Sequence, residues 1–175
     1  MPWYAIQYKP GQGDRALENL QNQGAVCFFP KISVEKIQRG KRTTKLEPLF
    51  SGYLFVSIEQ ADPLWSKLRS TRGVTRVVGF ANKPAVIDEL VIEYIRQSVQ
   101  TLSEQGGLRQ GQKVQLQNGP FKGLEAVFEN FEGEERACIL ITFMQQQQRI
   151  KVPLSTLKIA FKAGKGMPGF SNPPE

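Results

Sequence analysis

The chain has 175 residues, of which 40% are hydrophobic, and it carries a formal net charge of +7 with two cysteines and no histidine. The apolar content supports a packed interior and excludes global disorder, while the positive charge favours anionic partners. Without histidine the commonest general base and metal ligand is missing, and two cysteines alone cannot hold zinc. We therefore expect a binding protein that is not an enzyme, with no metal site and no cofactor.

No apolar run approaches the roughly 20 residues that a membrane-spanning helix needs. Cys27 and Cys138 do not indicate a disulfide framework, which is typical of a reducing compartment. The expected location is the cytoplasm, with no membrane partner.

Strand-like segments dominate the first hundred residues. Apolar residues alternate with polar ones, or form short runs between turn residues, at positions 3–8, 25–29, 32–37, 53–58 and 74–80. Basic residues between positions 36 and 45 flank a turn at Arg39-Gly40 and predict a basic hairpin arm.

Three helices are predicted among these strands, each with an aspartate at its N-cap: Asp14, Asp62 and Asp88. Gly24 is expected to end the first helix, and Pro63 to open the second. This order of elements fits an α+β fold, an antiparallel sandwich of about 100 residues. The predicted organisation is an N-terminal domain at 1–100, a linker at 101–110, a C-terminal domain at 111–160 and a disordered tail at 161–175.

The C-terminal domain fits two patterns. With a period of two, residues 113–117, 124–128, 136–143, 150–152 and 156–159 form strands of a small five-stranded barrel. With a period of 3.6, the same region forms two helices joined at Gly133, with apolar stripes at Leu124, Val127, Phe128 and Phe131 and at Ala137, Leu140, Ile141 and Met144. Four consecutive glutamines at 145–148 favour the helix, and an isolated helical hairpin needs a partner surface for its stripe.

The segment from Glu47 to Val56 places large apolar residues in a turn. Leu49 and Phe50 lie between Pro48 and Gly52, just ahead of the predicted strand that begins at Tyr53. Apolar side chains are hard to bury in a turn, so this segment suggests a docking surface as much as a core. An exposed Leu49, Phe50 and Tyr53 would supply the partner surface that a helical hairpin needs.

Several motifs in register resemble the NusG family of transcription elongation factors, and within it the RfaH branch. The resemblance covers Trp3 to about Lys158 and is carried by Glu35-Lys-Ile-Gln-Arg-Gly-Lys-Arg-Thr43, Glu47-Pro-Leu-Phe, Tyr53-Leu-Phe-Val56, Trp3-Tyr4, Lys9-Pro-Gly11, Ser70-Thr-Arg-Gly-Val74, Gly111-Gln-Lys-Val and Gly119-Pro-Phe-Lys-Gly123. It implies a monomeric transcription elongation and antitermination factor whose N-terminal domain binds RNA polymerase and suppresses pausing and termination. It also implies that this domain grips the non-template DNA strand.

The RfaH-like resemblance implies a C-terminal domain of the KOW type with two folds. When docked it is an α-helical hairpin that covers the polymerase-binding face, and when released it is a five-stranded barrel that engages a small-subunit ribosomal protein. The docked hairpin would use an interdomain apolar surface made of Leu124, Val127, Phe128, Leu140, Ile141 and Met144.

The resemblance also assigns residues to the two binding surfaces. The apolar site for the polymerase clamp helices would consist of Leu49, Phe50, Tyr53, Phe55 and Phe80. The DNA site would consist of Lys9, Gln12, Asn19, Gln23, Lys41, Arg42, Arg69, Thr71 and Arg72. Lysine and arginine contact phosphates or base edges, and asparagine and glutamine can read bases. Ordinary core packing for Phe55 and a solvated charged face for Lys41 and Arg42 are the alternatives.

Glu47 and Arg136 match the family's interdomain ion pair and are the predicted latch between the two domains. The alternative is two unrelated surface charges. The chain departs from the RfaH pattern at Leu64-Trp65-Ser66-Lys67 and at Asn22, which replaces a basic residue of the DNA site. Two other functions therefore stay open, namely a general NusG-like elongation factor with a permanent barrel, and a ribosome-associated or RNA-binding module.

Overall fold

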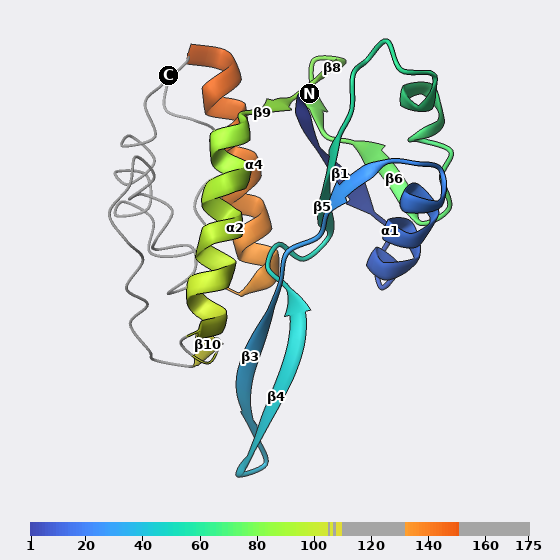
Figure 1. Cartoon of the computed structure of the whole chain (residues 1–175). Helices are drawn as coiled ribbons and strands as arrows, with labels where there is room; N and C mark the ends of the chain where they lie inside the picture. Colours follow the sequence, from blue (N-terminus) through green and yellow to red (C-terminus); the bar gives the residue numbers. More distant parts are fainter. Residues whose placement is uncertain (105, 107, 110–131, 151–175) are drawn as a thin grey trace. The chain divides into compact units, whose positions relative to one another are not determined.

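The structure is a computed structural model that describes residues 1–104, 106, 108–109 and 132–150 (Figure 1). Two compact units alternate along the chain. The first unit comprises Met1–Pro30 and Gly52–Glu93, and the second comprises Lys31–Ser51 and Tyr94–Glu175. The boundaries of the domains predicted from the sequence stay predictions.

The first unit is built on a five-stranded sheet with the order β2-β5-β1-β6, in which β9 also pairs with β1. The strands are β1 (Trp3–Tyr8), β2 (Val26–Phe28), β5 (Tyr53–Ser57), β6 (Val74–Val77) and β9 (Val86–Ile87). The strand pairs β1–β5, β1–β6, β2–β5 and β1–β9 are all antiparallel. A separate two-stranded hairpin consists of β7 (Gly79–Phe80) and β8 (Lys83–Pro84).

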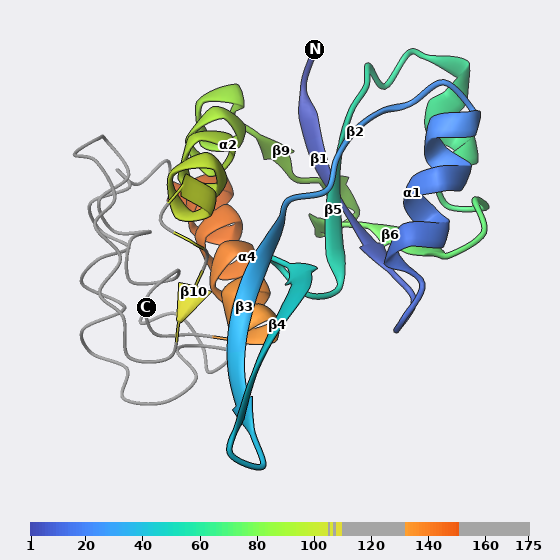
Figure 2. The ribbon, with the colours of Figure 1, turned by 60° about the horizontal axis from the view of Figure 1, so that its bottom comes forward.

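One face of this sheet packs against helix α1 (Gly13–Asn22) and the 3-10 helix η1 (Pro63–Lys67) to form the core of the first unit (Figure 2). Ala16 and Leu20 of α1 are completely buried. The strands contribute alternate side chains, because successive residues of a strand point to opposite faces. The buried members of this core are Tyr4, Ile6, Tyr8, Ala16, Leu20, Leu54, Val56, Ile58, Leu68, Val74 and Val77.

The opposite face of the sheet carries an aromatic group. Phe28 lies opposite Phe55 in the β2–β5 register, with ring centroids 5.9 Å apart, and Trp3 meets Phe28 edge-on at 6.5 Å. Phe55 is completely buried and Trp3 nearly so. None of the three belongs to the core cluster around α1. The sheet therefore has two apolar faces, of which only one is occupied by α1 and η1.

The described residues of the second unit form a long hairpin, a short strand, most of helix α2 (Glu89–Glu104) and helix α4 (Gly133–Ile150). Strands β3 (Lys31–Gln38) and β4 (Lys41–Pro48) pair over their whole length, and β10 (Leu108–Arg109) adds to β3 in parallel. Arg39 and Gly40 at the tip both have positive φ, as a two-residue hairpin turn requires. Helix α2 starts in the first unit and continues into the second, where it lies beside α4 in both views (Figures 1 and 2).

Several expected helix boundaries agree with the structure and one does not. Asp62 and Asp88 accept hydrogen bonds from Leu64 N (2.8 Å) and Leu90 N (2.9 Å), which confirms both as N-caps. The first helix instead has Gln12 at its N-cap, without a side-chain cap hydrogen bond. Asp14 was the wrong choice because it already lies in the first helical turn, where its charge complements the helix dipole.

One strand needs correction, because the strand expected at 74–80 is divided into β6 and β7. Of the two alternatives for residues 136–143, the structure has the helix, since they lie within α4. Leu49 and Phe50 are not exposed in their turn but buried, with 0% and 3% of their surface exposed, which agrees both with core packing and with a face covered by a docked hairpin. The other barrel strands and the first helix of the predicted hairpin lie outside the described residues. No helix in the described ranges is long and apolar enough to cross a membrane.

Candidate functional site

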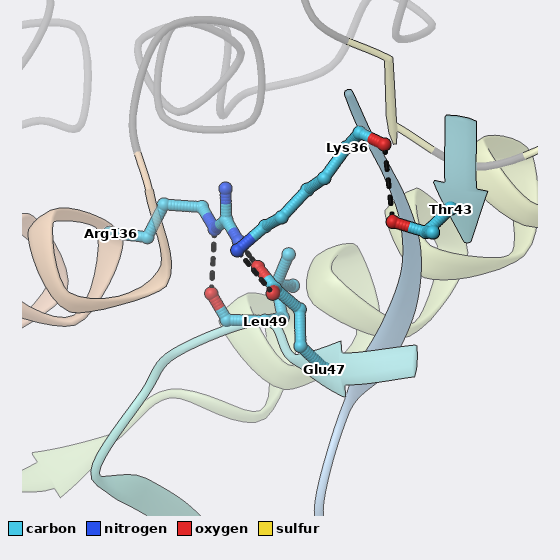
Figure 3. Close-up of polar contacts among 5 residues, drawn as sticks. All are labelled: Lys36, Thr43, Glu47, Leu49 and Arg136. Atoms are coloured by element: carbon cyan, nitrogen blue, oxygen red, sulfur yellow. Dashed lines mark hydrogen bonds and ion pairs between the residues drawn. The ribbon is translucent and has the colours of Figure 1, made fainter. Parts of the chain in front are cut away.

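The start of α4 is held against the segment that follows β4 by a buried arginine (Figure 3). The Arg136 Nε donates a hydrogen bond of 2.7 Å to the Leu49 carbonyl, and its Nη2 lies 3.6 Å from Glu47 Oε1. Only 3% of the Arg136 side chain is exposed, compared with 21% for Glu47. The guanidinium thus contacts both a carboxylate and a main-chain carbonyl of one short segment.

Glu47 has a second cationic neighbour on the same hairpin. The Lys36 Nζ lies 3.4 Å from Glu47 Oε2, and 46% of the Lys36 side chain is exposed. The Lys36 carbonyl in turn accepts a hydrogen bond of 3.2 Å from Thr43 Oγ1 across the strand pair (Figure 3). Glu47 is therefore shared between a largely solvated cation and a buried one.

The main chain at the start of α4 supplies further contacts. Ser51 N donates to the Gly133 carbonyl at 3.0 Å. The first turn is closed by two hydrogen bonds, from Arg136 N to the Glu132 carbonyl (2.8 Å) and from Glu132 N to Glu135 Oε2 (3.0 Å). The second of these is the glutamate half of a capping box. The sequence around Gly133 therefore fixes a helix start at the place where Arg136 must project toward Glu47.

Burial lowers the pKa of Arg136, and the neighbouring carboxylates of Glu47, Glu132 and Glu135 act in the opposite direction. A buried ion pair contributes little net stability compared with an apolar pair of similar volume, but removing one partner is costly because it leaves a buried charge without compensation. The free energy of this contact therefore depends strongly on Glu47 being in place.

Helix α4 also buries an apolar stripe. Ala137, Leu140 and Met144 are 1%, 2% and 4% exposed, while Ile141 is half-buried. Their spacing follows the predicted helical pattern. The matching residues expected on the first helix of the hairpin, Leu124, Val127 and Phe128, lie outside the described residues.

The residues expected to bind polymerase fall into both units. Leu49 and Phe50 are in the second unit, beside the contacts of Arg136 and Gly133. Tyr53, Phe55 and Phe80 are in the first unit, where Phe55 belongs to the aromatic face and the other two are half-buried. Phe55 is completely buried, which agrees with the alternative of core packing, although it lies outside the core cluster against α1.

Four of the residues expected to bind DNA form one hydrogen-bonded group, which we call the DNA cluster: Asn19, Gln23, Thr71 and Arg72. The Gln23 Nε2 donates to Thr71 Oγ1 (2.9 Å) and to the Asn19 carbonyl (3.1 Å), and Asn19 Nδ2 donates to the Arg72 carbonyl (3.1 Å). These bonds join the end of α1 to the loop that precedes β6.

Two more expected DNA residues lie next to this loop. Lys9 N donates to the Gly73 carbonyl at 2.8 Å, and Gln12 N donates to the Lys9 carbonyl at 2.9 Å. Gly73 has a φ of +93°, and a Cβ there would lie 3.0 Å from Ala16 N, so only glycine lets the loop approach α1 this closely. The turn before α1 and the loop after η1 are thereby brought together.

The remaining expected DNA residues lie elsewhere in the chain. Lys41 and Arg42 are at the exposed end of the β3–β4 hairpin in the second unit, where Arg42 Nε lies 3.5 Å from Glu35 Oε1. Arg69 is exposed and lines a hollow of the first unit. Six of the nine expected DNA residues therefore lie around α1 within the first unit.

Sequence reasoning missed Lys36 and the Leu49 carbonyl as partners of the Glu47–Arg136 pair. The position of Lys36 within the basic run gave no sign that it would meet Glu47, because the two are not directly opposite in the strand register. A main-chain acceptor such as Leu49 O leaves no signal in a sequence at all.

The two cysteines have no arrangement typical of a reactive or metal-binding site. Burial raises the pKa of the Cys27 thiol to about 11, and burial together with Glu134 and Glu135 raises the pKa of Cys138. In the part of the chain that the structure describes, no three Cys, Asp or Glu side chains lie close enough together to hold a metal ion.

Comparison with known proteins identifies the family of the chain. Residues 1–96 match the family model for NusG, described as transcription termination factor nusG. The transcription termination/antitermination protein NusG of Helicobacter pylori strain J99 is 28% identical over 149 residues, covering 78% of this chain and 85% of its own length. The NusG of Campylobacter jejuni is 28% identical over 142 residues (74% and 80%), and that of Thermus thermophilus is 23% identical over 175 residues (87% and 95%). The chain belongs to the NusG family of transcription termination/antitermination factors.

Proposed function

We propose that this protein is an RfaH-like antitermination factor, which binds RNA polymerase and is held inactive by its own C-terminal region until it is released. The observation that carries the proposal is the buried Arg136 at the start of α4, paired with Glu47 and bonded to the Leu49 carbonyl. Arg136 makes these contacts from the first turn of α4 (Gly133–Ile150).

A helix at this place favours the RfaH-like function over a general factor with a permanent barrel. A permanent barrel would use the 136–143 region as a strand, and Glu47 would have no buried arginine to pair with. The matched relatives carry the NusG name, and they support both functions equally. The contacts of Arg136 are what supports the RfaH-like alternative.

The polymerase would bind the aromatic face of the first unit, which carries Phe55 and is not used by α1 or η1. Leu49 and Phe50 of the second unit would provide further polymerase contacts once α4 leaves the segment after β4. In the released state the C-terminal domain would refold into a five-stranded barrel and bind a small-subunit ribosomal protein, coupling transcription to translation in the cytoplasm.

The non-template DNA strand would bind at the DNA cluster. Gln23 and Asn19 carry amide groups that can read base edges, and Arg72 is exposed beside them. Lys9 at the neighbouring turn would contact phosphate. Lys41 and Arg42 at the end of the hairpin would provide a second phosphate contact.

The proposal is tested by comparing the NMR spectra of the wild-type protein and of the full-length Glu47→Ala variant. In Glu47→Ala the Arg136 charge is left buried, so we expect a second set of signals with strand-like chemical shifts for residues 133–150. Glu35→Ala is the matched control, because it removes a carboxylate that pairs with Arg42 on the same hairpin. If both variants retain only the helical signals, the latch is not what holds α4.

Binding to RNA polymerase gives the second test. Glu47→Ala should increase the amount of polymerase retained by the immobilised protein, since opening exposes the site. Tyr53→Ala and Phe80→Ala, which replace half-buried aromatic residues, should decrease it in the Glu47→Ala background. Retention that is independent of Glu47, Tyr53 and Phe80 would favour the general factor with a permanent barrel.

A further inference from the structure

The first unit contains a basic hollow that has no part in the proposed polymerase and DNA contacts, apart from Arg69. It has a volume of about 540 Å³, within the range of about 300–1,000 Å³ typical of small-molecule sites. Its lining includes the cations Arg69, Arg76 and Lys83, together with Trp65 and Asn82. No aspartate or glutamate is among its lining residues.

The three cations come from three different elements and converge on one concavity. Arg69 follows η1, Arg76 is on β6 and Lys83 is on β8. Among the described residues, none of them is within ion-pair distance of a carboxylate. Cations that converge on a hollow without acidic neighbours create a local positive potential, which favours an anionic ligand.

One of these cations is held in a defined orientation. Arg76 Nε donates a hydrogen bond of 2.8 Å to Gln7 Oε1, across the β1–β6 pair. A guanidinium has five N–H donors, so this bond fixes the plane of the group and leaves donors for a ligand. Planar, oriented guanidinium groups are well suited to phosphate oxygens.

The wall formed by the β7–β8 hairpin is rigid. A Cβ at Gly79 would collide with the Lys83 carbonyl, so the two strands approach as closely as only glycine allows. Ala81 and Asn82 at the turn both adopt positive φ, of 51° and 61°, which is uncommon for non-glycine residues. Conformations of this kind persist where the surrounding structure holds them, and they are frequent beside binding sites.

Trp65 adds an aromatic surface to the hollow. Its ring packs edge-on against Tyr4, with centroids 4.7 Å apart, and the side chain remains half-buried. An indole beside cations is the combination that binds nucleotides, because the base stacks on the ring while phosphates meet arginine and lysine. An inorganic anion has no aromatic ring and would gain nothing from stacking on the indole of Trp65.

We propose that the hollow binds a nucleotide, with its phosphate on Arg69, Arg76 and Lys83 and its base against Trp65. The nucleotide is either free or one unit of a single strand. This site goes beyond the proposed function, since it needs neither RNA polymerase nor opening of α4.

The two tryptophans of the chain make the proposal directly testable by NMR of the full-length protein. Trp65 lines the hollow, whereas Trp3 lies in the aromatic group of the other sheet face and serves as an internal control. Titration with ADP should shift the indole N–H signal of Trp65 and leave that of Trp3 in place. Inorganic phosphate should bind more weakly than ADP, because it lacks the base.

Two variants identify the site. Lys83→Ala and Arg69→Ala should each weaken ADP binding about tenfold, the size expected for a charged hydrogen bond. Lys67→Ala is the matched control, because it removes an exposed lysine from η1 that does not line the hollow. Its affinity for ADP should equal that of the wild type.

The outcomes separate the sources of the nucleotide and can overturn the proposal. An oligothymidylate that shifts the Trp65 signal at lower concentration than ADP identifies a strand as the ligand of the hollow, whereas ADP that shifts this signal at equal or lower concentration identifies a free nucleotide. The proposal fails if the Trp65 signal does not move with millimolar ADP or oligothymidylate. It also fails if phosphate matches ADP, or if Lys67→Ala weakens binding as much as Lys83→Ala. The site test uses no polymerase, so its failure leaves the proposed function untouched.

Discussion

Helix α1 is attached to the first unit by apolar burial, while the start of α4 in the second unit is attached by a buried charge and main-chain hydrogen bonds. In α1, Ala16 and Leu20 are fully buried in the core cluster. In α4, the first turn is held by Arg136, whose contribution depends on Glu47. Apolar burial persists whatever the neighbouring charges do, whereas a buried arginine is tolerated only beside its partner. The start of α4 therefore depends on a charged partner in a way that α1 does not.

Removing apolar volume from α1 should have the largest effect. Leu20→Ala should lower the free energy of unfolding of the first unit by about 2–5 kcal/mol, because it leaves a cavity at a fully buried site. Denaturant titration followed by tryptophan fluorescence measures it, since both tryptophans are in this unit. Leu17→Ala, at a half-buried position of the same helix, should cost less. If Leu20→Ala lowers the free energy of unfolding by less than about 1 kcal/mol, apolar burial is not what attaches α1, and the contrast with α4 is lost.

Breaking the charge pair should open α4 without unfolding the first unit. Glu47→Ala should lower the opening free energy of α4 by about 1–3 kcal/mol, measured by hydrogen exchange of its amides. The double variant Glu47→Met/Arg136→Met should recover most of the opening free energy lost in Glu47→Ala, because two apolar side chains carry no desolvation penalty. If the α4 amides of the double variant exchange as fast as those of Glu47→Ala, the unpaired charge of Arg136 is not the cause of the opening.

The polar contacts of α1 should matter less than its apolar ones. Gln23→Ala removes the bonds to Thr71 and to the Asn19 carbonyl at an exposed helix end. We expect a loss of only about 0.5–1 kcal/mol in unfolding free energy, because water replaces these partners. DNA binding at the same cluster should weaken more clearly, which a fluorescence anisotropy titration with single-stranded DNA would show. If Gln23→Ala lowers the free energy of unfolding as much as Leu20→Ala does, α1 is not attached mainly by apolar burial.

The smallest effects on stability are expected from ionisation of the cysteines, one of which lies in each unit. The Cys27 thiol has a pKa raised from 9.0 to about 11 by burial, so the neutral thiol is favoured in the folded state. Its contribution to stability is complete below pH 9.0 and is lost as the pH rises toward 11. Labelling of Cys27 with a thiol reagent at pH 8 should be slow and should accelerate about tenfold for each pH unit up to that pKa.

Cys138 extends this measurement to α4. In Glu47→Ala, labelling of Cys138 should accelerate by about tenfold for every 1.4 kcal/mol of opening, while the rate at Cys27 stays constant. Equal acceleration at both cysteines would mean that the whole chain, and not α4 alone, is opening.

Patterns with local causes were predictable from the sequence. The strand at Trp3–Tyr8 and the N-caps at Asp62 and Asp88 follow from alternation and capping, and the structure confirms them. The N-cap was wrongly assigned to Asp14 because an aspartate at the N-cap and one in the first turn cannot be told apart in a sequence.

Burial produced by contacts distant in the sequence was not predictable. Leu49 and Phe50 seemed exposed because a turn rarely buries apolar groups, yet α4 begins beside them from more than eighty positions away. The hollow lined by Arg76 and Lys83 was missed for a related reason. Its cations are spread over three elements, and no local pattern marks their convergence.

The hydrogen bond from Ser51 N to the Gly133 carbonyl has a consequence for how such proteins diverge. It joins two backbone groups, so any residue except proline at position 51 preserves it, and an alignment cannot reveal whether a relative has it. Under the proposed release of α4, substitutions at Glu47 and Arg136 would change how readily the helix opens, while this backbone hydrogen bond would remain available to the closed state. A proline at position 51 would delete this one donor and leave every side chain of the latch unchanged.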